Sequence, residues 1–220
     1  TAQQGGYALS GYLDRLSHHP LESSMSRLEG ADYPDAVGIA LLMAHEQVLE
    51  QLRIEHPQQE RIAVSLLDAL SLLAASGVPT HWLLRLDADS DAVRDTLSVL
   101  KSASVIQESS DGDKTFIHWL QGHVYRETYL NDQKKLGEAR TCAASVLSGI
   151  DVDRLEDGEQ RRHETRHLIE QLLSVTSQDY SHSLFSEPRV SSKLAETLHY
   201  ATGLGMSQLA LCLTDSVTRA

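Results

Sequence analysis

The hydrophobic pattern is clearest between Ile62 and Leu130, where a helical period changes to an alternating one and then returns. Apolar residues at helical spacing predict a first helix in this stretch, with a core-facing stripe made of Ile62, Leu66, Ala69, Leu70 and Leu73. Gly77 is expected to stop this helix, and Pro79 to open the next turn. A short helix around Trp82 should follow.

Ser90, followed by Asp91, is the expected N-terminal cap of a third helix that ends near Ser102. Residues 104–108 and 114–118 then read as two strands, and the Asp-Gly pair between them favours a tight turn. The chain passes directly from the second strand into a helix whose apolar residues are expected to be Trp119, Leu120, Val124 and Tyr125. Three helices, a hairpin and a fourth helix is the order of a winged-helix module.

Helical patterns flank this module on both sides. Before it, a helical stripe is formed by Val37, Leu41, Ala44, Val48 and Leu52, and Pro57 within a polar linker should separate this helix from the next. After it, apolar periodicity predicts helices over residues 136–147 and 161–177 and a helical hairpin over 191–219. The sequence therefore predicts a mainly α fold with a small β-hairpin.

Charge and cysteine usage narrow the functional classes. The chain has 220 residues, a net charge of −12 and a pI near 5.3, a balance that disfavours nucleic acid and anionic membrane surfaces as partners. Its two cysteines, Cys142 and Cys212, are expected to be buried free thiols, as is typical of cytoplasmic proteins. No leader pattern and no apolar run of membrane-spanning length is visible, so we expect a soluble protein.

The segment FIHWLQGHVYRE resembles the end of the winged-helix domain in bacterial NB-ARC-type (STAND) signal-transduction NTPases, where a strand ending in histidine leads into a helix. His118 falls on the histidine of that motif, while Ile117 and Trp119 stand where plant relatives have Met and Asp. GYALSGYLDRL, which begins at Gly6, resembles the last part of the helical subdomain that precedes this module, so the resemblance covers residues of about 7 to 130.

This resemblance implies a domain order and a role for one residue. Residues 1–57 would be the helical (ARC-like) segment, 58–130 the winged-helix domain, and 131–220 a helical region that begins a TPR-like array. His118 would contact the β-phosphate of bound ADP and hold the inactive state, since an imidazole can donate a hydrogen bond to phosphate. ADP or ATP with Mg²⁺ would be the cofactors of a longer parent protein, and the residues of this chain would hold none alone.

The C-terminal hairpin suggests how such a parent would find partners. Tyr200, Gly205 and Ala210 lie near the aromatic, glycine and alanine positions of a tetratricopeptide repeat, offset by a residue from the usual spacing. The resemblance therefore implies protein partners bound through helical repeats, and assembly of the parent that depends on nucleotide. The sequence contains no phosphate-binding loop, so we expect no enzyme activity from this chain alone.

Two alternative functions remain open from sequence. His163, Glu164 and His167 fit the H-E-x-x-H pattern of zinc hydrolases, in which two imidazoles on one helical face bind the metal and the glutamate acts as general base. Three arginines of the same helix, Arg161, Arg162 and Arg166, oppose a divalent cation, so a solvated polar face is the simpler interpretation.

The second alternative is a DNA-binding transcriptional regulator, in which residues 91–102 would form the recognition helix. The stretch from Ile62 to Leu130 has five Lys or Arg against nine Asp or Glu, a local net charge of −4. A protein that reads a DNA groove needs the opposite sign, so the charge disfavours this function.

Overall fold

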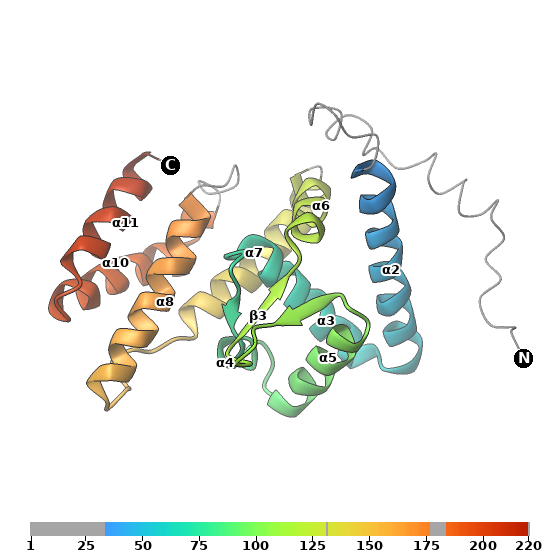
Figure 1. Ribbon diagram of the computed structural model, residues 1–220, viewed down its shortest axis with the longest axis horizontal. Coiled ribbons are helices and arrows are strands. Elements are labelled where there is room, and N and C mark those ends of the chain that lie inside the picture. The colour runs from blue at the N-terminus through green and yellow to red at the C-terminus, as the bar shows by residue number, and fades with distance from the viewer. Residues whose placement is uncertain (1–33, 131, 177–183, 220) are drawn as a thin grey trace, which may run out of the picture.

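The computed structural model describes residues 34–130, 132–176 and 184–219 of the chain, which are mainly helical and include one small antiparallel sheet (Figure 1). The segment GYALSGYLDRL, which resembles part of a helical subdomain, lies outside the described residues. The elements are, in order, α2 Pro34–Glu55, α3 Pro57–Leu72, β1 Val78–Pro79, α4 Thr80–Leu83, α5 Ser90–Ser102, β2 Ile106–Glu108, β3 Lys114–Ile117, α6 Trp119–Leu130, α7 Gln133–Ser148, α8 Gly158–Thr176, α10 Pro188–Gly203 and α11 Ser207–Arg219.

Helix α3 is the centre of the fold. It packs against α2, α5, α6 and α7 and lies between them in Figure 1. All five residues of its predicted stripe are buried, so this prediction is confirmed. One cluster of buried apolar side chains extends from Leu52 on α2 to Leu213 on α11 and passes through α3. This continuous core crosses the boundaries that the sequence predicts near residues 57 and 130, and those boundaries stay predictions.

The break between α2 and α3 is confirmed at Pro57, but its form differs from the prediction. Pro57 is the first residue of α3, and the polar residues after it, expected in a linker, form the first turn of the helix. Proline suits this position because its fixed φ fits the helix and its missing N–H would have no partner there. Glu60 in the same turn adds a favourable interaction with the positive end of the helix.

The sheet has the strand order β1-β3-β2, with both pairs antiparallel. The predicted hairpin is confirmed as β2 and β3, each a little shorter than expected. Strand β1 was not predicted, because two residues are too few to show a period. Gly77 precedes it with φ of +105°, and a Cβ there would lie 3.0 Å from the Cβ of Lys114, so a side chain at this position would be strained and crowded.

Helix α5 begins one residue earlier than predicted. Its N-cap is Asp89, whose carboxylate accepts hydrogen bonds from the backbone N–H groups of Asp91 and Ala92 at 3.1 and 3.0 Å. The predicted cap, Ser90, is the first residue of the helix instead. Three consecutive residues of the segment DSD can cap a helix, so the pattern alone does not choose among them.

The C-terminal helices continue the core. Helix α7 packs against α3. Helices α8 and α10 lie side by side, and α10 and α11 form the predicted helical hairpin. Both cysteines are free thiols, as expected, but Cys142 is half-buried and Cys212 exposed, so the prediction that both are buried is wrong. Among the described helices, none combines the length and the apolar character that crossing a bilayer requires.

The predicted inner stripe of α2 is confirmed at Leu52, which is buried, and at Val48, which packs against the core, but it is wrong at Ala44. Ala44 is exposed, whereas His45 is 2 % exposed and lies against Tyr125 of α6, with ring centroids 5.2 Å apart. Neither ring nitrogen of His45 has a hydrogen-bond partner among the described residues. Burial lowers the pKa of His45 to about 4, because the protonated ring would lose its hydration without compensation. Helix α2 is therefore held to α6 by a histidine that must stay neutral.

We expect acid to weaken the fold through His45. The unfolded chain takes up this proton near pH 6.5 and the folded chain only near pH 4, so the stabilisation is complete above pH 6.5 and is lost as the pH falls toward 4. A shift of this size corresponds to roughly 3 kcal/mol. Urea denaturation measures how much unfolding free energy is lost between pH 7 and pH 4.5. This loss should be smaller in His45→Phe than in the wild type. The matched variant His199→Phe, at an exposed site on α10, should lose as much as the wild type. Equal losses in all three proteins would contradict this prediction.

Candidate functional site

The first candidate site is the junction of β3 and α6, where His118 is the only residue between strand and helix. Ile117 pairs with Ile106 in the sheet and is buried, so the backbone enters the junction from a fixed position. Gly122, in the first turn of α6, lies against this strand, and a Cβ there would be 3.3 Å from a methyl group of Ile117. These contacts fix the place from which His118 extends.

His118 acts as the N-cap of α6. Its carbonyl oxygen accepts a hydrogen bond from the N–H of Gly122 at 2.9 Å, and its Nδ1 accepts one from the N–H of Leu120 at 3.3 Å. Since Nδ1 is the acceptor, the proton of the neutral ring lies on Nε2. The side chain is exposed, so the structure presents Nε2 as a hydrogen-bond donor at the surface.

Trp119 lies beside this imidazole, with ring centroids 5.9 Å apart, and is 61 % exposed. The prediction that Trp119 packs inward is therefore wrong. Trp119 and the buried Val124 are five positions apart, which places the two side chains about 140° from each other around a helix. The junction thus offers solvent an exposed aromatic ring, an imidazole donor and the positive end of a helix, a combination that suits a planar ligand carrying a negative charge.

The second candidate site is the side of α8 that faces β1, α4 and β3, and it contains the H-E-x-x-H motif. Glu164 is 5 % exposed and accepts hydrogen bonds from two neighbouring residues of α4: Nε2 of His81 at 2.8 Å and Nε1 of Trp82 at 2.7 Å. Burial alone would raise the pKa of Glu164, but the hydrogen bonds from His81 and Trp82 outweigh it and hold the pKa below its usual value.

The expectation of a solvated polar face on this helix is confirmed for Arg162, His163 and Arg166, which are exposed, but it is wrong for Glu164. Glu164 and Thr165 are buried, and so is Gln171 further along the helix. Both carboxylate oxygens of Glu164 are occupied by donors on α4, so Glu164 is not free to act as a general base. His81 looks isolated in the sequence, and no spacing could pair it with a residue 83 positions away.

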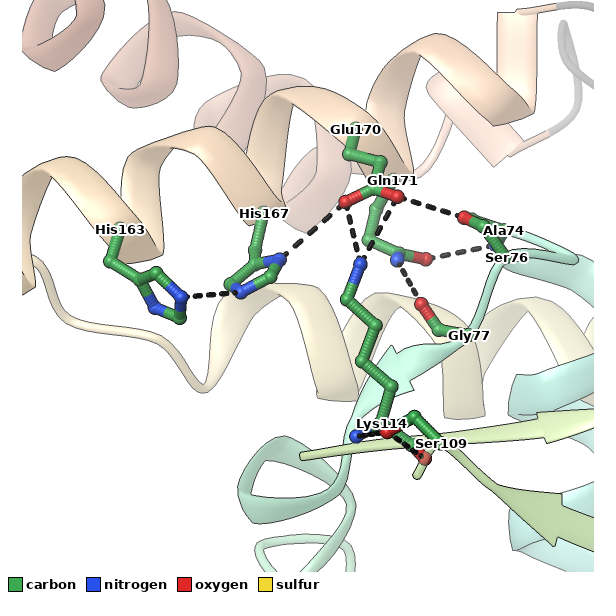
Figure 2. Close-up of polar contacts among 9 residues, drawn as sticks. All are labelled: Ala74, Ser76, Gly77, Ser109, Lys114, His163, His167, Glu170 and Gln171. Atoms are coloured by element: carbon green, nitrogen blue, oxygen red, sulfur yellow. Dashed lines mark hydrogen bonds and ion pairs between the residues drawn. The ribbon is translucent and has the colours of Figure 1, made fainter. Parts of the chain in front are cut away.

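Residues Glu170 and Gln171 anchor α8 to the loop before β1 and to β3. The Gln171 amide is fully buried, accepting from Ala74 N–H and donating to the Gly77 carbonyl, both at 2.8 Å (Figure 2). Glu170 pairs with Nζ of Lys114 at 2.9 Å and accepts a hydrogen bond from Ser76 at 2.9 Å. Burial alone would raise the pKa of Glu170, but the hydrogen bonds from Lys114 and Ser76 outweigh this effect, so the pKa lies below its usual value. The C-terminal helices are thus connected to the sheet by polar contacts.

His163 and His167 lie one helical turn apart on α8, and their Nε2 atoms are 3.2 Å from each other (Figure 2). Nδ1 of His167 lies 3.5 Å from Oε2 of Glu170, a distance that permits an electrostatic contact but not a good hydrogen bond. Burial and the charges of His163 and Lys114 lower the pKa of His167, although Glu170 acts in the opposite direction. The parts of the chain that the structure describes contain no group of three or more His, Cys, Asp or Glu placed to hold a metal ion.

Helix α5, the recognition helix of the DNA-binding alternative, has its basic side chains engaged. Arg94 pairs with Asp91 at 2.7 Å, and Lys101 pairs with Glu108 of β2. The lining of the hollow beside α5 includes Glu55 and Asp95. Carboxylates that pair with the basic side chains of α5 or line this hollow would repel DNA phosphates, which is unfavourable for that function.

Comparison of the chain with protein-family models, with curated proteins and with solved structures finds no match.

We predict that Glu164 stabilises the packing of α8. Glu164→Ala leaves the buried indole N–H of Trp82 without an acceptor and removes the partner of His81, so the unfolding free energy should fall by roughly 2–4 kcal/mol. Urea denaturation at pH 7 measures this loss. The control is Glu159→Ala, an exposed glutamate in the first turn of the same helix, which should change stability by less than about 0.5 kcal/mol. Equal stability of the two variants would contradict the assignment.

Proposed function

We propose that residues 58–130 form a winged-helix module. The order helix, strand, short helix, helix and hairpin supports this proposal, as does the sheet order β1-β3-β2 with the hairpin at one edge. Residues 109–113, between β2 and β3, would be the tip of the wing. Helices α10 and α11 would begin a TPR-like region, since they form an antiparallel pair packed against α7 and α8.

We further propose that this module is a regulatory part of an NB-ARC-type signal-transduction NTPase, and that His118 contacts the phosphate of bound ADP. The observation that carries the proposal is the geometry of His118: an exposed ring at the exit of β3, with Nδ1 occupied by a backbone N–H and Nε2 left to donate. Nucleotide hydrolysis would be carried out by residues of a longer polypeptide, since this chain lacks a phosphate-binding loop.

In this proposal, the module stabilises the ADP-bound state through one directed hydrogen bond. Phosphate oxygens would accept the proton of Nε2 and also benefit from the positive end of α6, a 12-residue helix. Trp119, exposed beside His118, would be covered by the nucleotide-binding part of the same polypeptide. Exchange of ADP for ATP would release this contact and let the module move away.

The contacts of α8 suggest how a signal would reach His118. Lys114 begins the strand that ends next to His118, and its ammonium group pairs with Glu170 of α8. A partner that binds the helical region and displaces α8 would therefore pull on β3, the strand that positions the imidazole. This arrangement supports a role in which the helical region senses a protein partner and the winged helix controls ADP release.

The test is ADP retention in a polypeptide that contains the nucleotide-binding segment together with these residues. His118→Ala should speed the release of fluorescent ADP by a factor of about 10–100, since a hydrogen bond to a charged group contributes roughly 1.5–3 kcal/mol. His199→Ala, an exposed histidine of α10, is the matched control and should release ADP at the wild-type rate. An unchanged release rate in His118→Ala would refute the proposed role of this residue.

A further inference from the structure

His163 and His167 form a pair of imidazoles whose geometry the proposed function does not use. Their Nε2 atoms face each other at 3.2 Å, and their ring planes are perpendicular. His163 is exposed, whereas the side chain of His167 is only 12 % exposed, so the pair is fixed on one side and open to solvent on the other. Figure 2 shows both rings on the same face of α8.

Glu170 orients the inner ring of the pair. Its Oε2 lies 3.5 Å from Nδ1 of His167, and the carboxylate is itself held by Lys114 and Ser76. A carboxylate facing Nδ1 favours the tautomer with the proton on that atom, which leaves a lone pair on Nε2. In metal sites, the ring nitrogen of a histidine that does not bind the metal commonly faces a carboxylate.

We propose that His163 and His167 together bind a divalent transition-metal ion of the class that prefers imidazole, such as Zn²⁺, Ni²⁺ or Cu²⁺. Metal–nitrogen bonds of about 2.1 Å to two atoms 3.2 Å apart enclose an angle of roughly 100°. This angle lies between the octahedral and tetrahedral values, so the spacing of the two nitrogens fits one shared ion, and the perpendicular rings would rotate to direct both lone pairs at it.

This site differs from that of an H-E-x-x-H hydrolase. Glu164 points to His81 and Trp82, so it cannot activate a water molecule on the metal. Within the described ranges no third side chain completes the ligand set, and water would fill the remaining positions. The positive charges of Arg162 and Arg166 on the same helix reduce the affinity for a metal ion. The positive charge of Lys114 is partly offset by Glu170. The site would therefore bind an exchangeable ion without hydrolytic activity.

The experiment is calorimetric titration of the tag-free chain at pH 7.5 with Zn²⁺, Ni²⁺ and Cu²⁺ separately. We expect about one equivalent of at least one of these ions to bind, and this equivalent to be lost in His163→Ala and in His167→Ala. Glu170→Gln should weaken binding by about 10–100-fold, because the group that orients His167 is altered. His199→Ala, an isolated exposed histidine on α10, should leave the titration unchanged. Circular dichroism checks that each variant is folded.

A spectroscopic measurement identifies the ligands independently of the variants. Electron paramagnetic resonance of the wild-type chain with one equivalent of Cu²⁺ should show coordination by two imidazole nitrogens, and His163→Ala should remove that signal. The absence of binding by all three ions would overturn the proposal and leave a plain N–H···N hydrogen bond between the rings. Binding that persists unchanged in His163→Ala would overturn it too, since the ion would then be held by other histidines.

Discussion

The packing of α8 against the rest of the molecule depends on two buried polar side chains, Glu164 and Gln171. Each is paired with groups that would otherwise be orphaned in the interior: the indole N–H of Trp82 for Glu164, and the backbone of Ala74 and Gly77 for Gln171. An unpaired polar group costs free energy when it is buried, so a sliding of α8 by one residue would break several of these contacts at once. The contacts therefore specify one register of the helix, which apolar packing alone does less strictly.

This constraint connects the two candidate sites. Glu170, next to Gln171, pairs with Lys114 of β3 and faces His167, while the other end of β3 leads to His118. Under the proposed function, the phosphate-contacting imidazole and the metal-binding pair would thus lie on elements that one ion pair joins. Occupancy of the histidine pair by a metal ion would stiffen α8 at the point where it holds β3, and this offers a route by which the helical region could influence the nucleotide.

Much of the fold could be predicted from the sequence, because α3, α5 and the hairpin have strong local patterns with turn residues between them. The prediction that Ala44 faces inward is wrong, because a period cannot reveal that the neighbouring His45 is buried as a neutral ring. Of the sites, His118 is exposed at the exit of β3, and its proposed role comes from the resemblance alone and stays a prediction. The partners of Glu164 could not be predicted, because they depend on how distant segments pack and leave no trace in local spacing.

The most direct measurement is a crystal structure, with ADP bound, of a polypeptide that joins the proposed nucleotide-binding segment to these residues. The account predicts that Nε2 of His118 lies within hydrogen-bonding distance, about 2.7–3.2 Å, of a phosphate oxygen, with Trp119 covered and the pairing of Lys114 with Glu170 retained. A structure in which the phosphates are bound elsewhere and the His118 ring still faces solvent would contradict the central claim, even if every helix and strand stayed in place.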